Sequence, residues 1–130
     1  MNHATGRILL VDDEPSLLKM MGVYLSRLGY SVTLADSTEQ AWAEVEASPS
    51  GYDIAVLDGS MPGLSTEDLA LKMLAANPSL CVVAASGYFV DTAAMEAAAP
   101  GRVAVLRKPF APEMLVAELR RMLAAQEEKL

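Results

Sequence analysis

Two residue types that build structural crosslinks are almost missing from this chain. Of its 130 residues, one is a cysteine, Cys81, and one is a histidine, His3. A single cysteine excludes an internal disulfide, and these two residues cannot supply the four ligands of a structural zinc site. No apolar run approaches the roughly 18 to 20 residues that a membrane-spanning helix needs, and Met1–Arg7 lacks the apolar centre of a secretory signal. We therefore expect a cytoplasmic protein without a segment inserted in a membrane.

Basic residues are also few. The sequence has 10 lysines and arginines against 17 aspartates and glutamates, which gives a net charge of −7 and a sequence pI of about 4.6. Because nucleic-acid binding depends largely on basic side chains that contact phosphates, we expect no direct contact with nucleic acid. With 52% hydrophobic residues the composition is that of a globular protein, and the length is that of one domain. We expect a single domain over 1–130, with its core at about 6–126.

Apolar runs of strand length alternate with segments of helical periodicity. The runs predict strands at 8–11, 31–35, 54–57, 80–85 and 102–106. The helical segments are expected to begin at Pro15, at the capping residues Ser37 and Ser65, at Asp91 and at Pro112. This alternation predicts an α/β fold, in which a parallel sheet is covered on both faces by right-handed crossovers.

The segment Asp91–Ala98 differs from the other expected helices in its apolar content. It is rich in alanine, and Met95 is its only large apolar residue. Alanine favours a helix locally, but one large side chain provides little burial to anchor it. We predict that this is the most mobile helix of the domain.

Charged residues lie just beyond three of the expected strands. Asp12 and Asp13 follow the first strand, Asp58 follows the third, and Lys108 lies beyond the fifth. Ligands of parallel sheets bind beyond the carboxyl ends of the strands, so one rim is expected to gather three carboxylates and an ammonium. Crowded carboxylates repel one another and are rarely found without a cation or a catalytic use. Oxygen ligands favour Mg²⁺ over zinc, and the added lysine indicates a phosphoryl ligand.

Four short motifs occur at and near these positions. They are Val-Asp-Asp-Glu-Pro at 11–15, Asp-Gly-Ser-Met-Pro-Gly at 58–63, Ser-Gly-Tyr at 86–88 and Lys-Pro-Phe at 108–110. In type, order and spacing they resemble the receiver domain of two-component response regulators, in the chemotaxis-regulator-like superfamily. The resemblance spans nearly the whole chain. It implies a flavodoxin-like, doubly wound sheet of five parallel strands in the order 2-1-3-4-5, with five helices and a ligand site between strands one and three.

The resemblance implies that Asp58 is a phosphoacceptor. In the family, this aspartate takes a phosphoryl group from a phosphohistidine on a histidine kinase or a histidine phosphotransfer protein, which is nucleophilic catalysis at a carboxylate. By position, Lys108 would pair first with the acceptor carboxylate and then with the phosphoryl oxygens, and the Ser86 hydroxyl would bond to the phosphoryl group. The peptide bond between Lys108 and Pro109 is expected to be cis. Such a domain catalyses its own phosphorylation and dephosphorylation without turning over a small-molecule substrate.

The same resemblance implies a magnesium site. Asp12 and Asp13 match the aspartate pair that holds Mg²⁺ in the family, with Asp58 and the backbone carbonyl of Ser60 as further ligands. The metal would neutralise charge as it develops on the transferring group. Signalling would follow from a conformational change that a downstream protein detects.

Position 105 departs from the family pattern. Many receivers have an aromatic residue there, whose ring swings inward when the hydroxyl residue engages the phosphate, whereas this chain has Val105. We hypothesise that the loop 86–89 and the helix Asp91–Ala98 carry the change instead, with Tyr88 or Phe89 as the reporting aromatic residue.

Several alternatives remain at the level of the sequence. Each motif alone has a plainer explanation, because Asp12 or Asp13 can cap a helix and Asp58 can begin a turn. A phosphatase of the haloacid dehalogenase type also uses an aspartate after a strand, but it needs a second aspartate two positions later, where this chain has Ser60. A pseudo-receiver that binds proteins without phosphorylation is a further alternative, although it would be expected to lack Asp58 or Lys108. The chain ends soon after the last expected helix, so we expect either a stand-alone receiver or part of a larger protein, such as a hybrid sensor kinase.

Overall fold

A computed structural model describes residues 6–58, 65–86 and 92–128. Within these ranges, five strands alternate with five helices. The strands are β1 (Arg7–Val11), β2 (Ser31–Ala35), β3 (Ile54–Asp58), β4 (Cys81–Ser86) and β5 (Val103–Arg107). The helices are α1 (Pro15–Arg27), α2 (Thr38–Ala47), α3 (Thr66–Ala76), α4 (Ala93–Ala98) and α5 (Pro112–Glu128). The predicted alternation of strands and helices is confirmed.

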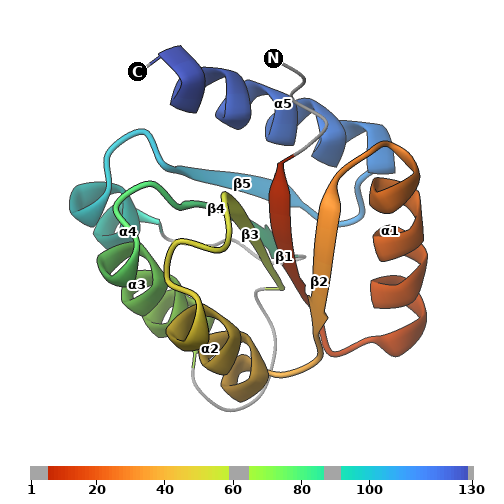
Figure 1. The fold of residues 1–130 in the computed structure, drawn as a ribbon, viewed down its shortest axis with the longest axis horizontal. Helices are drawn as coiled ribbons and strands as arrows, with labels where there is room; N and C mark the ends of the chain where they lie inside the picture. The colour runs from red at the N-terminus through yellow and green to blue at the C-terminus, as the bar shows by residue number, and fades with distance from the viewer. Residues whose placement is uncertain (1–5, 59–64, 87–91, 129–130) are drawn as a thin grey trace.

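The strands form one parallel sheet in the order β2-β1-β3-β4-β5, as predicted. α1 and α5 cover one face of the sheet, and α2, α3 and α4 cover the other (Figure 1). The chain adds β2 on one side of β1 and then places β3 on the other side, where Val11 pairs with Leu57. The carboxyl ends of β1 and β3 are therefore neighbours at the point where the strand order reverses, which is where ligands bind in such sheets.

Side chains of β1 alternate between the two faces of the sheet and contribute to two hydrophobic clusters. Ile8 and Leu10 belong to the cluster that α1 and α5 cover, whereas Leu9 and Val11 belong to the cluster of α2 and α3. All five residues of β3 are buried. Burial on both faces explains why these strands appear in the sequence as continuous apolar runs instead of alternating ones.

Three strands extend one residue further than their apolar runs. β3 includes Asp58, β4 includes Ser86 and β5 includes Arg107, so the boundaries expected from the sequence are one residue short at these ends. The parallel ladder continues past the apolar runs, because Asp58 pairs with Ala85 and Ser86 pairs with Arg107. Backbone pairing does not require an apolar side chain, so these polar residues remain part of the regular sheet at its carboxyl edge.

Hydrogen bonds confirm the two serine caps that the sequence predicted. The Ser37 hydroxyl accepts a bond from the Gln40 amide at 3.1 Å at the start of α2. At the start of α3, Ser65 accepts from the Asp68 amide, also at 3.1 Å. The Gln40 side chain accepts from the amide of Asp36 at 2.8 Å, one residue before the cap. The capping box of α2 therefore closes one residue earlier than its usual form.

The two ends of α1 follow from proline and glycine chemistry. Pro15 is the first residue of the helix, as predicted. At the other end, the amide of Gly29 donates to Ser26 at 3.0 Å and the amide of Tyr30 donates to Leu25 at 3.2 Å. Gly29 has a φ of 102°, a left-handed conformation that glycine adopts without a steric penalty. α1 thus starts directly beyond the acidic pair and turns back into β2.

α4 begins later than the sequence indicated. It starts at Ala93 after Thr92, whereas Asp91 lies outside the described residues. Met95 is buried with an exposed fraction of 1%, and Ala99 beyond the helix is also buried. The expectation of one large apolar anchor is confirmed, and the greater mobility of α4 stays a prediction.

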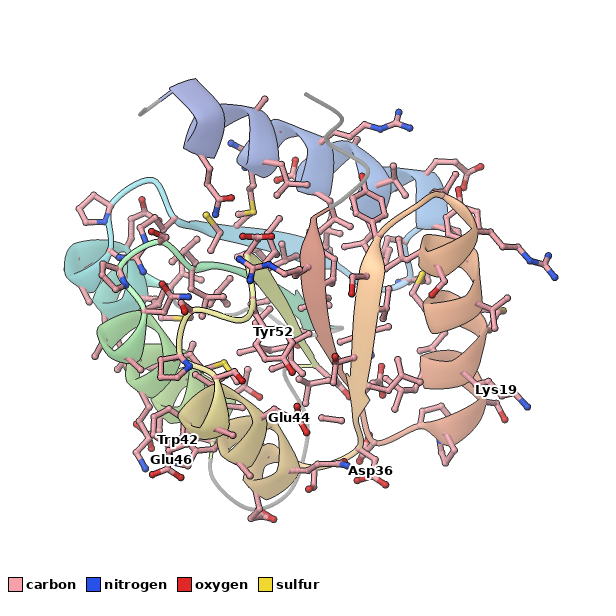
Figure 2. The ribbon with its side chains drawn as sticks, in the orientation of Figure 1. Lys19, Asp36, Trp42, Glu44, Glu46 and Tyr52 are labelled. Carbon is pink, nitrogen blue, oxygen red and sulfur yellow. The ribbon has the colours of Figure 1, made fainter. Side chains whose placement is uncertain are left out.

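α2 also packs through aromatic side chains. Trp42 is half-buried against the cluster on this face, and the Lys72 ammonium lies 4.9 Å from the centre of its ring. Tyr52, which precedes β3, donates a hydrogen bond to Glu44 at 2.7 Å (Figure 2). Trp42 therefore packs against this face of the sheet, and Cys81 is buried. Among the described residues, no helix has the length and apolar character needed to cross a membrane.

Candidate functional site

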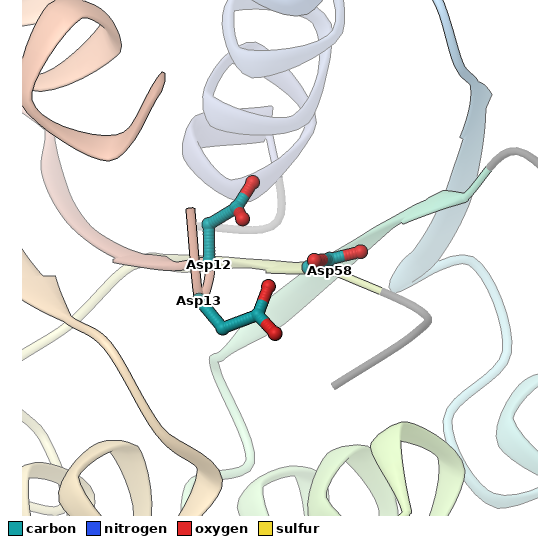
Figure 3. Close-up of side chains that lie close together, drawn as sticks. All are labelled: Asp12, Asp13 and Asp58. Carbon is teal, nitrogen blue, oxygen red and sulfur yellow. The ribbon is translucent and has the colours of Figure 1, made fainter. Parts of the chain in front are cut away.

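Three carboxylates meet at the carboxyl edge of the sheet. Asp12 follows β1 directly, Asp13 is the next residue, and Asp58 is the last residue of β3. Because β1 and β3 are paired, these three side chains lie together (Figure 3). One carboxylate oxygen from each residue lies within 4.8 Å of the others. The grouping of these residues at one rim, which the sequence predicted, is what the structure shows.

Lys108 directly follows β5, and its ammonium reaches across β4 to the acidic cluster. Its Nζ lies 3.3 Å from Asp58 Oδ1 and 3.6 Å from Asp12 Oδ2. The backbone amide of Lys108 donates to the Ser86 carbonyl at 2.8 Å, which ties the residue to the end of β4. Neighbouring strands lie about 4.8 Å apart, so only a long side chain can extend from β5 past β4 to β3. In the described part of the chain, Lys108 therefore pairs with two of the three carboxylates and leaves an excess of negative charge.

Burial raises the pKa of Asp12. This residue is only 9% exposed, so loss of water disfavours its charged form, and the neighbouring Asp58 carboxylate raises the pKa further. Two contacts act in the opposite direction, namely a hydrogen bond from the Glu14 amide at 2.9 Å and the charge of Lys108. The net direction is upward, so the folded protein disfavours the ionised form of Asp12.

The backbone of Asp58 is held by a residue that the sequence analysis did not identify. The Thr66 hydroxyl donates a hydrogen bond to the Asp58 carbonyl oxygen at 2.7 Å. Thr66 is the first residue of α3, so this bond joins the start of the helix to the end of β3. No motif or periodicity marks Thr66 in the sequence, because the contact depends on how α3 returns to the sheet.

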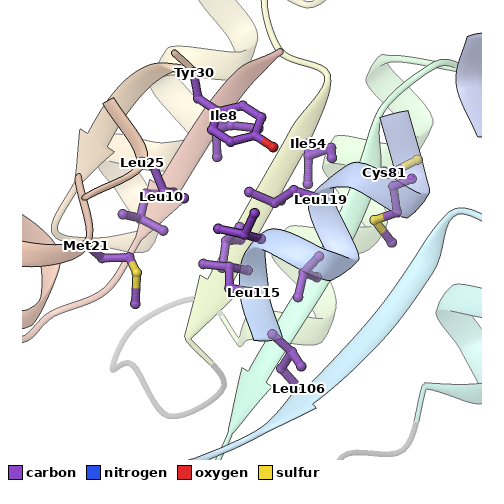
Figure 4. Packing of buried hydrophobic residues seen from close by; sticks show 14 of the residues in the cluster. Ile8, Leu10, Met21, Leu25, Tyr30, Ile54, Cys81, Leu106, Leu115 and Leu119 are labelled. Carbon is purple, nitrogen blue, oxygen red and sulfur yellow. The ribbon is translucent and has the colours of Figure 1, made fainter. Parts of the chain in front are cut away.

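An apolar cavity of about 220 Å³ adjoins the acidic cluster. Its lining includes Leu10 of β1, Met21 of α1 and Leu115 of α5, which lie on the same face of the sheet (Figure 4). The lining also includes Asp12 and Asp58. Apolar surroundings lower the local dielectric constant and strengthen the electrostatic interactions of the adjoining charges.

Ser86 lies next to the strand that carries Asp58, and the peptide bond after Lys108 has the predicted geometry. Ser86 is the last residue of β4, has an exposed fraction of 2% and lies on the strand next to that of Asp58. The peptide bond between Lys108 and Pro109 is cis, as predicted.

Val105 lies on β5 and is 45% exposed. The valine side chain at this position is therefore at the surface and not directed into the core. The remaining residues that the sequence singled out lie outside the described residues: Ser60, Tyr88 and Phe89.

Comparisons with known proteins agree on one family. Residues 8–120 match the family described as the response regulator receiver domain. The chain is 29% identical over 119 residues to the response regulator receiver protein CpdR of Brucella abortus (strain 2308), covering 92% of this chain and 98% of CpdR. It is 32% identical over 118 residues to the C4-dicarboxylate transport transcriptional regulatory protein DctD of Rhizobium meliloti (strain 1021), covering 91% of this chain and 25% of DctD.

A solved structure with the same fold is a response regulator receiver domain protein from Clostridium thermocellum. Its TM-score is 0.85 at 23% identity, and the match covers 96% of this chain and 99% of that chain. At this identity the likeness shows the fold alone. The chain spans less than half of the length of several curated relatives that it matches. Because the family match covers most of the chain and the sheet order is that of its members, this chain belongs to the response regulator receiver domain family of two-component signalling.

Proposed function

We propose that this domain accepts a phosphoryl group on Asp58 from the phosphohistidine of a histidine kinase or a histidine phosphotransfer protein. The observation that carries the proposal is one buried carboxylate, 4% exposed, with an ammonium 3.3 Å away. Asp12 and Asp13 contribute carboxylate oxygens within 4.8 Å of it. Membership of the receiver family supports the same role for Asp58.

The donor set of this site fits a magnesium ion. Three carboxylates offer hard oxygen ligands, which Mg²⁺ prefers, and the raised pKa of Asp12 indicates that a cation would stabilise the ionised cluster. We assign Asp12, Asp13 and Asp58 to the ion, with the backbone carbonyl of Ser60, outside the described residues, as a further ligand. When bound, the ion would neutralise charge on the phosphoryl oxygens.

In the proposed step, an oxygen of the Asp58 carboxylate attacks phosphorus and forms an acyl phosphate. The bond that breaks joins phosphorus to the imidazole nitrogen of the donor histidine, which leaves with the bonding electron pair. The Lys108 ammonium already contacts Asp58, so it can follow the negative charge to the phosphoryl oxygens with little movement. The Ser86 hydroxyl, at the end of the neighbouring strand, would donate to the phosphoryl group.

The proposed output is a conformational change next to the phosphorylated residue. Val105 is small and exposed, so we assign the change to the segment that follows Ser86 and to α4. A downstream protein would detect it, and the net charge of −7 supports action without direct contact to nucleic acid. The proposal applies equally to a stand-alone receiver and to the receiver of a hybrid sensor kinase.

Intact mass spectrometry tests the proposal. The chain is incubated with acetyl phosphate in the presence of Mg²⁺ or of EDTA. We expect one added phosphoryl group that requires the metal and is absent from Asp58→Asn. Asp53→Asn is the matched control, because Asp53 precedes the same strand at its opposite end and pairs with Arg7 at 3.1 Å; this variant should still take up the group.

Fluoroberyllate binding provides the second measurement for the same proposal. It mimics the phosphoryl group without a transfer step, so it separates a slow reaction from a site that cannot hold the product. A chain that neither gains mass nor binds fluoroberyllate would refute the proposal and favour the pseudo-receiver alternative.

A further inference from the structure

We infer that Thr66 is a positioning residue for the acceptor aspartate. Its hydroxyl holds the backbone at the end of β3 in the conformation that keeps the Asp58 carboxylate within the acidic cluster. This inference rests on the proposed function of Asp58 and extends it to a neutral residue of α3.

The hydrogen bond between these residues has a favourable length and lies in a buried environment. Thr66 Oγ1 lies 2.7 Å from the Asp58 carbonyl oxygen, and the two residues have exposed fractions of 9% and 4%. This separation is the most common one for hydrogen bonds donated by hydroxyl groups. Loss of the donor to a buried carbonyl destabilises the folded state, because water cannot replace the bond. Threonine is branched at Cβ, which restricts the direction of its hydroxyl more than in a flexible side chain.

The bond acts on the carboxylate through the backbone of the same residue. Asp58 pairs with Ala85 of β4 on one side, and Thr66 holds its carbonyl from α3 on the other. With both contacts in place, the Cα–Cβ direction of Asp58 is fixed relative to Lys108 and Asp12. The contact between Asp58 and Lys108 is 3.3 Å, so a shift of about 1 Å in the carboxylate would break it, and such shifts can lower reaction rates about 100-fold.

The same bond joins the two ends of the connection that contains Ser60. The described residues at its ends are Asp58 and Ser65, and the Thr66 hydroxyl links the last residue of β3 to the first residue of α3. Asp58 is also one of the three residues whose carboxylate oxygens lie within 4.8 Å of one another, so a shift of its backbone moves one of the proposed Mg²⁺ ligands. Loss of the hydroxyl should therefore weaken Mg²⁺ binding even before any phosphoryl transfer.

A purely structural role for Thr66 predicts a different pattern of effects. Ser65 caps α3 through a hydrogen bond from the Asp68 amide at 3.1 Å, and Ser65→Ala removes this cap without touching the hydroxyl of Thr66. Both Ser65→Ala and Thr66→Val weaken the start of α3, but only Thr66→Val removes the donor to the Asp58 carbonyl. Ser65→Ala is therefore the matched control for stability.

The test measures Mg²⁺ affinity by amide chemical shifts for the full chain and three variants. We expect Thr66→Val to raise the Kd for Mg²⁺ about 5- to 10-fold, the factor that corresponds to one hydrogen bond. Thr66→Ser keeps the hydroxyl, so it should stay within about twofold of the wild-type Kd. Ser65→Ala should also stay within about twofold while its unfolding midpoint falls. If Thr66→Val does not fold, Thr66→Ala replaces it under the same criteria.

Two results would overturn the inference. The first is a Thr66→Val chain whose Kd for Mg²⁺ equals that of the wild type, and the second is an equal rise in Kd for Ser65→Ala. Phosphorylation by acetyl phosphate is followed in the same samples. If the wild type neither gains a phosphoryl group nor binds fluoroberyllate, the proposed function fails, while the ratio of Mg²⁺ affinities still decides the role of Thr66.

Discussion

Replacing Lys108 with methionine is expected to destabilise the metal-free domain by about 2 kcal/mol at neutral pH. The ammonium lies 3.3 Å from an oxygen of Asp58 and 3.6 Å from an oxygen of Asp12. At an effective dielectric constant of about 20, each attraction is about 5 kcal/mol before desolvation. Breaking a buried pair costs about 3 to 5 kcal/mol. The Lys108 side chain is 27% exposed, so screening and the recovered hydration of lysine reduce the expected loss to about 2 kcal/mol.

Urea unfolding in EDTA, followed by the fluorescence of Trp42, measures this loss. Trp42 is the single tryptophan of the chain. Lys19→Met is the matched control, because Lys19 is exposed on α1 and points away from the sheet (Figure 2). Its unfolding free energy should stay within about 0.5 kcal/mol of the wild type. Millimolar Mg²⁺ should reduce the cost of Lys108→Met, since a cation replaces the lost positive charge.

A double variant tests the electrostatic origin of the effect. Asp58→Asn removes one of the two carboxylates that Lys108 contacts. Combined with Lys108→Met, it should recover about half of the lost stability, because one uncompensated buried charge disappears. The reasoning is wrong if Lys108→Met unfolds like the wild type, or if the double variant is as unstable as Lys108→Met alone.

Three further perturbations follow from the same structure. Burial and the charge of Asp58 raise the pKa of Asp12 in the folded protein, so the folded state binds this proton more tightly than the unfolded chain. The resulting contribution to the free energy of unfolding is present at low pH and is lost as the pH rises above about 4, through the raised pKa. The stability of Asp12→Asn relative to the wild type should therefore increase between about pH 4 and pH 7 in metal-free urea titrations; a constant difference would contradict this. The Arg102 guanidinium donates to three backbone carbonyls: Leu74 in the last turn of α3 at 3.3 Å, Asn77 after this helix at 2.7 Å and Leu80 before β4 at 2.8 Å. Arg102→Met should lower the free energy of unfolding by about 2 to 3 kcal/mol, and Arg102→Lys should lower it by less. Equal decreases for the two variants would show that the planar guanidinium is not needed to donate these bonds. The Tyr30 hydroxyl is buried and has no hydrogen-bond partner among the described residues. Tyr30→Phe should therefore unfold at the same or a higher urea concentration than the wild type. A decrease in the free energy of unfolding above about 1 kcal/mol would show that the hydroxyl is bonded.

Local patterns in the sequence were sufficient to predict the elements and the acidic rim. Continuous apolar runs mark strands that are buried on both faces, and Ser37 and Ser65 mark helix starts through bonds that span three residues. Asp12, Asp13 and Asp58 could be placed together because the carboxyl ends of parallel strands share one edge. The order of the strands came from the resemblance of four motifs to a known family, since periodicity alone does not determine which strands are neighbours.

Only the tertiary structure decided which atoms meet at that rim. The contact between Lys108 and Asp58 joins residues 50 positions apart, and the bond from Thr66 to Asp58 depends on how α3 returns to the sheet. The raised pKa of Asp12 likewise depends on how much water the surrounding elements exclude. The extension of β3 to Asp58 results from pairing with β4, which the polarity of the residue conceals in the sequence. Sequence periodicity encodes which face of an element is buried, whereas distances between side chains are set by strand register and helix packing.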